Sequence, residues 1–267
     1  MVKEYSSVLS IAGSDSGGCA GIQADIKSIS ANGAYAATVI TATTAQNTVG
    51  VTDIHDIPII HIEKQLEAVL SDIQFGAVKI GMLPSAEVIE LVANKLQEYG
   101  IKKIILDPVM VATSGDKLIS EEAIKRLRSF LSDVYLITPN IPEAEILLGR
   151  TISFQTLELS AKEIAEKFNT SVLLKGGHLE LKEMMTDLLY LKDEKKFVTI
   201  NNPTIETNHT HGTGCSLSST IATYVSLGYS LEESVIRGCK YVNSAIEQGK
   251  NMLLGKGNGP INHFGLF

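Results

Sequence analysis

A glycine-rich turn in the last quarter of the chain has the residue types of an anion site. The turn, His211-Gly212-Thr213-Gly214-Cys215, directly precedes an apolar segment at 217–227 with helical spacing. Glycines at a helix start let the backbone approach a ligand, and the helix dipole favours negative charge there. We therefore expect an anion hole at residues 212–215. A tight loop capped by Thr213 is the simpler interpretation of an isolated G-x-G pair.

Cys215 brings a thiol to this turn. A free cysteine is most often a small buried apolar residue. At a helix N-terminus, however, its pKa is expected to fall below the usual value of about 8.5. The position therefore predicts a partial thiolate near neutral pH. The three cysteines, Cys19, Cys215 and Cys239, form no C-x-x-C pair, which argues against structural zinc and favours a reducing, cytoplasmic location.

A second glycine-rich turn, residues 13–21, joins the first expected strand to the first expected helix. Ligands of doubly wound sheets bind at the carboxyl ends of the strands, so this turn belongs to the functional edge. It contains neither the G-x-x-x-x-G-K-[ST] motif nor the G-x-G-x-x-G fingerprint. Neither a Walker A loop nor a Rossmann dinucleotide site is predicted.

Three further strand ends carry polar groups. Lys175 follows an apolar run at 172–174, Asp107 follows one at 104–106, and Asn140 and Glu143 follow one at 136–137. Singly, they are explained as a surface lysine, a turn former, and a helix cap with its reciprocal partner. Together they place a lysine, two carboxylates and an amide on the edge that carries the anion hole. This set is what a magnesium-nucleotide site requires.

The elements that must position these residues alternate along the chain. Amphipathic helices, for example those beginning near His61 and Ser120, fall between β-rich runs, which predicts an α/β fold with a mostly parallel sheet covered by helices. Residues 36–57 look like several successive strands projecting from that sheet, and 187–200 look like a hairpin turning at 192–195. Two helices end the chain, the second opening with a capping box at 230–233. Strands are expected at 8–12, 77–80, 103–106, 134–138 and 171–175.

Composition limits the possible partners. The chain has 267 residues, an apolar fraction of 44% and a net charge of -7, so one large domain, 1–267, is expected. The negative charge argues against nucleic-acid binding, and any phosphate must be held locally. The uncharged stretch 28–52 is interrupted by polar residues and is expected to be buried protein, not membrane. The apolar run at 8–12 is too short for a secretory signal.

Taken in order, the motifs resemble those of the hydroxymethylpyrimidine/phosphomethylpyrimidine kinases of thiamine biosynthesis, in the ribokinase-like superfamily. The resemblance runs nearly end to end. It rests on residues 12–18, 21–27, 45–48, 79–83, 107–110, 114–116, 138–143, 175–178, 211–215 and 255–257.

The resemblance implies a three-layer α/β/α fold with a small β flap that covers the acceptor and often forms a homodimer interface. It implies transfer of the ATP γ-phosphoryl group, with Mg²⁺, to 4-amino-5-hydroxymethyl-2-methylpyrimidine and then to its monophosphate. Gln46 would meet the hydrogen-bonding edge of the pyrimidine. The other acceptor residues would be Gly13, Asp25, Thr44, Met82 and Val109; the nucleotide residues Asp107, Asn140, Lys175 and Thr213; the metal residues Asn140 and Glu143; and the catalytic residues Lys175, Gly212, Thr213, Gly214 and Cys215.

Cys215 stands where most ribokinase-like enzymes have an aspartate base, and the pyrimidine-kinase branch carries cysteine there. Phosphoryl transfer has a loose transition state, so positioning and charge stabilisation matter more than a strong base. A second step whose acceptor is a phosphate oxygen needs no base. Our hypothesis is that Cys215 accepts or relays the hydroxymethyl proton in the first step only.

Three other functions are weighed against this one. Pyridoxal kinases of the same branch are associated with a second cysteine in the lid, where this chain has Val111-Ala112-Thr113. A sugar kinase is disfavoured because the apolar Met82 and Val109 suit a flat ring better than a polyol. A non-catalytic binding or regulatory protein would not need the nucleotide residues.

Closure of the flap and of loop 112–117 is expected to exclude water and keep ATP hydrolysis slow.

Overall fold

The computed structural model describes residues 3–110, 120–176 and 184–265; the expectations for the lid at 111–113 and for loop 112–117 lie outside these ranges. Within them the sheet has nine strands in the order β3-β2-β1-β4-β5-β6-β7-β8-β9. The strands are β1 (Ser7–Asp15), β2 (Tyr35–Gln46), β3 (Val51–Asp56), β4 (Ala77–Ile80), β5 (Ile104–Leu106), β6 (Leu136–Ile137), β7 (Ser171–Lys175), β8 (Met184–Leu191) and β9 (Lys196–Pro203).

The strands β1, β2 and β4 to β7 pair in parallel, while β3, β8 and β9 pair antiparallel. The helices are α1 (Gly21–Ala31), α2 (Ile59–Leu70), α3 (Ala86–Glu98), α4 (Glu121–Phe130), α5 (Ile141–Leu148), α6 (Leu157–Phe168), α7 (Thr213–Ser226) and α8 (Leu231–Gly249). The predicted α/β fold is confirmed.

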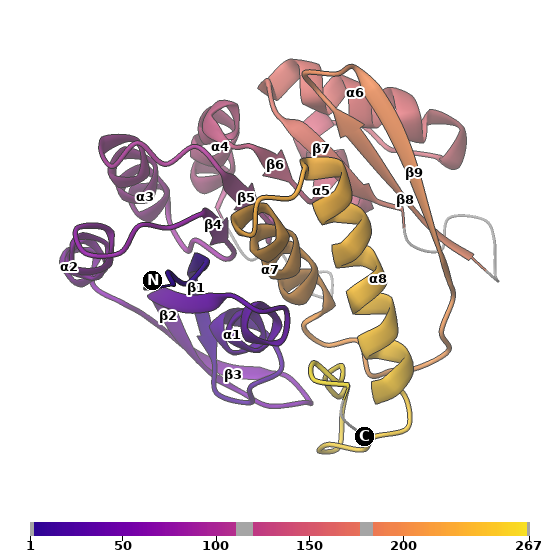
Figure 1. The fold of residues 1–267 in the computed structure, drawn as a ribbon, viewed down its shortest axis with the longest axis horizontal. Coiled ribbons are helices and arrows are strands. Elements are labelled where there is room, and N and C mark those ends of the chain that lie inside the picture. Colours follow the sequence, from indigo (N-terminus) through magenta and orange to yellow (C-terminus); the bar gives the residue numbers. More distant parts are fainter. Residues whose placement is uncertain (1–2, 111–119, 177–183, 266–267) are drawn as a thin grey trace.

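Helices cover both faces of the sheet, as Figure 1 shows. Alternate residues of β1 enter different cores: Leu9 and Ile11 pack on the side of α2 to α6, and Val8 packs on the side of α1, α7 and α8. The side chains of a strand alternate between faces, so a strand buried on both faces reads as a continuous apolar run. The result is a three-layer α/β/α arrangement.

The expected elements differ from the observed ones mainly at their ends. Strands 77–80 and 171–175 coincide with β4 and β7, while β5 and β6 have only three and two residues. The hairpin prediction is confirmed by β8 and β9, which are joined through 192–195, where Lys195 has a φ of 51°. Ser230 caps α8 by accepting a hydrogen bond from the Glu233 backbone amide.

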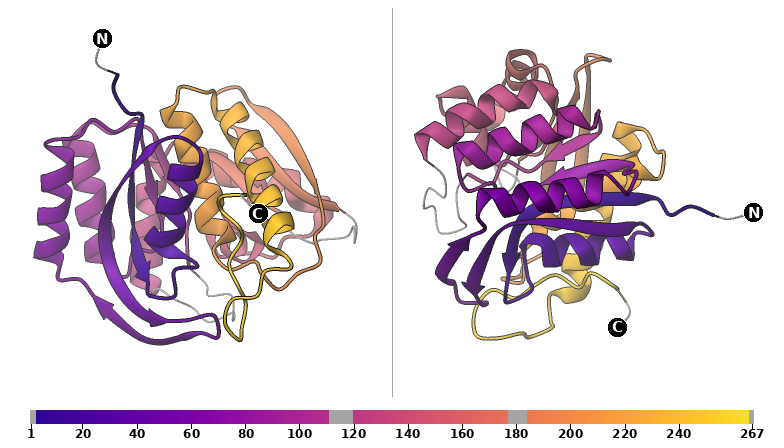
Figure 2. Two further views of the ribbon diagram at one scale, coloured as in Figure 1. Left: turned by 60° about the horizontal axis from the view of Figure 1, so that its bottom comes forward. Right: turned by 90° about the vertical axis from the view of Figure 1, so that its left-hand side faces the viewer.

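The run at 36–57 was expected to hold several strands projecting from the sheet, and the observed arrangement is simpler. Most of β2 lies within the sheet beside β1, and β3 is added at the edge, antiparallel to the last residues of β2 (Figure 2). All residues of β3 are exposed, among them Val51 and Ile54. The antiparallel ribbon formed by the end of β2, the turn after it and β3 (residues 42–56) is called the flap. No helix in the described part of the chain is long and apolar enough to cross a membrane.

Candidate active site

A lysine and an aspartate meet at the carboxyl ends of β7 and β5. Lys175 Nζ lies 3.0 Å from Asp107 Oδ1, and the same oxygen accepts a hydrogen bond of 3.0 Å from Thr138 Oγ1. A Cβ built on Gly214 would lie 3.1 Å from Asp107 Oδ2 and 3.6 Å from Lys175 Nζ. The fold therefore brings Lys175 and Asp107 against the first turn of α7, as their positions after parallel strands predicted.

Asn140 and Glu143 open α5 as a capping box. The Glu143 backbone amide donates to Asn140 Oδ1, and the Asn140 amide donates to Glu143 Oε2, both at 2.9 Å. Glu143 is only 3% exposed. Burial raises the pKa of its carboxyl to about 7, Lys175 lowers it and Asp107 raises it. Glu143 thus caps α5 and also lies within the electrostatic influence of Lys175.

The amino end of α7 lacks a side-chain cap. Gly212 is the N-cap with a φ of 85°, so the interpretation of Thr213 as the capping residue is wrong. A Cβ at Gly212 would overlap the carbonyl oxygen of Cys19, which lies in the other glycine-rich turn. Glycine is therefore required at 212 by both its backbone angle and this contact. First-turn amides without a side-chain acceptor are suited to an anion.

The predicted partial thiolate at Cys215 is wrong. The side chain is half-buried. Burial raises the pKa of the thiol to about 11, and although Lys79 lowers it, Asp25 and Asp107 raise it further. Desolvation and nearby carboxylates thus outweigh the helix dipole, because each disfavours the charged form. Cys215 is a neutral thiol at neutral pH.

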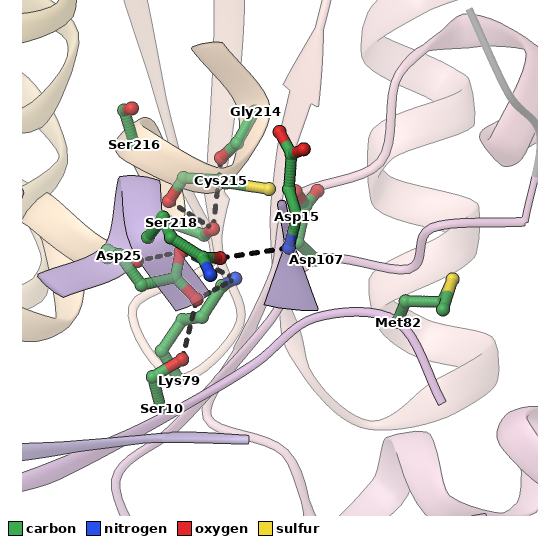
Figure 3. Close-up of polar contacts among 12 residues, drawn as sticks. Ser10, Asp15, Asp25, Lys79, Met82, Asp107, Gly214, Cys215, Ser216 and Ser218 are labelled. Carbon is green, nitrogen blue, oxygen red and sulfur yellow. Dashed lines mark hydrogen bonds and ion pairs between the residues drawn. The ribbon is translucent and has the colours of Figure 1, made fainter. Parts of the chain in front are cut away.

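Asp25 was expected to bind substrate, and the structure places it elsewhere. Its side chain is fully buried beneath the site and forms an ion pair with Lys79 at 2.7 Å (Figure 3). Ser10 Oγ and Ser219 Oγ also donate to the carboxylate, at 2.5 and 2.7 Å. With its oxygens engaged by three side chains, Asp25 positions α1, β1, β4 and α7 relative to one another, which is a structural role.

Among the expected acceptor residues, Gly13 lies beside Met82 and Thr44 lies beside Gln46. A Cβ on Gly13 would lie 3.2 Å from Met82 Cε, and Val109 follows β5 two residues after Asp107. At the end of β2, Thr44 Oγ1 donates to Gln46 Oε1 at 3.0 Å. An apolar side chain such as Met82 and an amide such as Gln46 are residue types that suit a flat heteroaromatic ring with a polar edge.

Three polar features were missed by sequence reasoning. Asp15 accepts from the backbone amides of Gly17, Cys19 and Ala20, at 2.8 to 2.9 Å, and so shapes the first glycine-rich turn. Gln46 Nε2 lies 3.1 Å from His211 Nε2, although the two residues are 165 positions apart in the chain. The third feature is the Lys79–Asp25 pair. A lysine inside the buried run of β4 was the one signal for it.

The fold has three layers, with a mostly parallel sheet between two layers of helices, and it brings Lys175 and Asp107 against an uncapped helix start. This combination is that of a kinase of the ribokinase-like class. The profile of one family, phosphomethylpyrimidine kinase, matches residues 15–262. The chain belongs to this family. The expectation drawn from the motifs is confirmed.

Relatives span nearly all of the chain. A bifunctional thiamine biosynthesis protein of Geobacter sulfurreducens is 46% identical over 96% of this chain, which spans about half (52%) of that protein. The hydroxymethylpyrimidine/phosphomethylpyrimidine kinase of Bacillus subtilis is 42% identical, with 96% of this chain and 94% of that protein covered.

Solved structures agree with the fold. The crystal structure of phosphomethylpyrimidine kinase from Clostridium difficile has a TM-score of 0.80 and 42% identity, covering 90% of this chain and 99% of that one. The ADP complex of Bacillus subtilis pyridoxal kinase has a TM-score of 0.90 and 29% identity, covering 98% and 99%.

Proposed function

We propose that this chain transfers the γ-phosphoryl group of ATP to 4-amino-5-hydroxymethyl-2-methylpyrimidine and then to its monophosphate. The observation that carries the proposal is the meeting of Lys175 and Asp107 with the uncapped amides of α7. A phosphoryl group in flight carries negative charge on its equatorial oxygens, and a lysine with backbone amides stabilises that charge. Membership of the phosphomethylpyrimidine kinase family supports the acceptor.

A magnesium ion that arrives with the nucleotide fits the residues present. Glu143 is a buried carboxyl beside Asn140, and burial raises its pKa. Among the described residues no three His, Cys, Asp or Glu side chains converge as a metal site. Mg²⁺ is usually held by one or two carboxylates plus substrate phosphates. Glu143, with Asn140 beside it, would hold the ion, which supplies charge neutralisation at the phosphates when bound.

Cys215 acts in this proposal as a relay, not as a preformed base. Because the thiol is neutral, its sulfur takes the hydroxymethyl proton as its own proton passes to a phosphoryl oxygen. The second acceptor is already a phosphate oxygen and needs no such step. We expect Cys215→Ala to lower the kcat of the first phosphorylation by about 100-fold or more, while the second changes little. Product formation on each acceptor, followed separately by ³¹P NMR, measures both; equal losses would refute the division.

Pyridoxal is the second candidate acceptor, favoured by the TM-score of 0.90 to a pyridoxal kinase. It too is a heteroaromatic ring with a hydroxymethyl group. The 42% identity to hydroxymethylpyrimidine kinases, against 29% to the pyridoxal kinase, favours the pyrimidine.

The proposal includes a homodimer in the cytoplasm. The flap exposes Val51 and Ile54 on the edge strand β3 and Val49 in the turn before it, and such an edge pairs readily with another chain. The three cysteines of the protein are free, in keeping with a reducing compartment. Sedimentation at micromolar concentration tests the assembly, and a monomer throughout would remove the dimer from the account.

A further inference from the structure

The side-chain amide of Gln46 is held at both of its ends. Thr44 Oγ1 donates to Oε1 at 3.0 Å, and Nε2 lies 3.1 Å from Nε2 of His211, 165 residues further along the chain. Ser16 Oγ accepts from the Gln46 backbone amide and donates to its carbonyl, both at 2.8 Å. Both the backbone and the amide tip of Gln46 are therefore fixed before any ligand binds.

This geometry determines where the proton of His211 resides. An amide nitrogen only donates hydrogen bonds, so the His211 Nε2 atom that faces it must accept. The ring is then neutral with its proton on Nδ1. The position of the ring is set by the chain: the His211 backbone amide donates to the Gly259 carbonyl at 3.2 Å, and the next residue is the N-cap of α7.

His211 is the stronger of the two constraints on the amide. The Thr44 hydroxyl has one proton, which it shares between Gln46 Oε1 and the Ser14 carbonyl at 3.1 Å. If that proton belonged to Ser14 alone, Thr44 could accept from a Gln46 amide that had turned over. Only the unprotonated Nε2 of His211 opposes this turn, because it has no hydrogen to give to Oε1. The tautomer of His211 and the orientation of Gln46 are thus coupled.

The orientation matters because of the groups that Gln46 has left to offer. An amide has two N–H donors and two lone pairs on its oxygen. Thr44 and His211 occupy one of each, which leaves one donor beside one acceptor. This pair matches a ring nitrogen next to an exocyclic amine. A 4-oxo pyrimidine in its lactam form presents the opposite order, N–H next to C=O, and fits only an amide that has turned over.

We propose that His211 is a specificity-determining positioning residue: its Nε2 atom holds the Gln46 amide in one orientation, and the acceptor site thereby selects a 4-aminopyrimidine over its 4-oxo counterpart. The inference rests on the proposed function for the identity of the acceptor. The contact between Gln46 and His211 is present in the protein without a ligand. A buried polar group left unpaired by the wrong acceptor is what makes such selection effective.

The kinetic test compares two acceptors that differ only at position 4. They are 4-amino- and 4-oxo-5-hydroxymethyl-2-methylpyrimidine, and the measured quantity is the ratio of their kcat/KM values. His211→Phe keeps a ring but removes the acceptor atom, and we expect it to lower the amino-to-oxo ratio by about tenfold. His211→Gln offers a carbonyl oxygen to Gln46 and should restore most of the ratio. His61→Phe, on the exposed surface of α2, is the matched control and should leave it unchanged.

The ratio separates selection from a merely structural role, which would lower both kcat/KM values equally. An unchanged ratio in a folded His211→Phe would overturn the proposal. The ¹⁵N chemical shifts of the His211 ring in the wild-type protein without ligand give a second test that needs neither a variant nor turnover. We expect Nδ1 to carry the proton and Nε2 to be free. A proton on Nε2 of the neutral ring would overturn the lock even in an active enzyme, whereas failure of both pyrimidines as substrates would overturn the proposed function.

Discussion

At the scale of single residues, the buried carboxyl of Glu143 carries a cost in stability at the position proposed to hold the magnesium ion. Its carboxyl is buried and its pKa is raised to about 7 from an ordinary 4.5. The folded chain therefore binds more protons than the unfolded chain between pH 4.5 and 7, so stability falls as pH rises through this window. A cation bound beside this carboxylate would favour its charged form and lower its pKa.

We expect Glu143→Gln to be more stable than the wild type at pH 7.5 and almost inactive. The gain in the free energy of unfolding should be on the order of 3 kcal/mol at pH 7.5 and should disappear by about pH 4. The Gln side chain can still accept from the Asn140 amide. Urea unfolding at a series of pH values measures the difference. Glu166→Gln on α6, an exposed carboxylate, is the control, and a pH-independent difference for Glu143→Gln would contradict the explanation.

The sequence predicted which residue types would meet at the site, but not their ionisation. Lys175, Asp107, Asn140 and Glu143 were placed correctly because each follows a parallel strand, and parallel strand ends share one edge. Cys215 was misjudged because its helix position is visible in the sequence and its burial is not. Asp25 was misjudged because its partner Lys79 is 54 residues away.

At the scale of elements, the start of α7 depends on contact with the β1–α1 turn. Gly212 has a positive φ and no room for a Cβ against the Cys19 carbonyl. Gly33, between α1 and β2, also has a positive φ of 91°, but a Cβ there would meet nothing within 4 Å. A substitution at Gly33 therefore tests backbone strain alone, and a substitution at Gly212 tests strain together with the steric contact.

We expect Gly33→Ala to cost only the strain, about 1 to 2 kcal/mol of unfolding free energy, and to keep its kcat. Gly212→Ala should cost more and lower kcat by at least about 100-fold, because displaced amides no longer meet the transferred phosphoryl group. Thermal unfolding and steady-state kinetics of both variants give the comparison. A Gly212→Ala enzyme with normal kcat would show that the α7 amides do not act on the phosphoryl group.

Element order was predictable because apolar runs and helical spacing are local patterns. The βαβ alternation, the β8–β9 hairpin and the last two helices could be predicted from such patterns, as could the edge that holds the site. The shortness of β6 could not, because the apolar residues Val134 and Tyr135 precede the two residues at which strand pairing occurs. The place of β2 within the sheet also depends on its long-range pairing with β1.

At the scale of the whole molecule, an acidic chain is proposed to bind a polyphosphate. The net charge is -7, so long-range attraction does not bring the nucleotide to the site. In the proposed function neutralisation is local, and Lys175, the amides of α7 and an incoming cation beside Glu143 would share the task. The same sheet edge carries the Gln46–His211 contact, so the proposal places phosphate and acceptor together where β1, β2, β5 and β7 end.

The central claim is the choice of acceptor, and a direct comparison tests it. Purified protein is given Mg-ATP with either 4-amino-5-hydroxymethyl-2-methylpyrimidine or pyridoxal, and kcat/KM is measured for each by product formation. The account predicts a higher value for the pyrimidine, with its monophosphate then converted to the diphosphate. A higher value for pyridoxal, or ATP binding without phosphorylation of the pyrimidine, would contradict it.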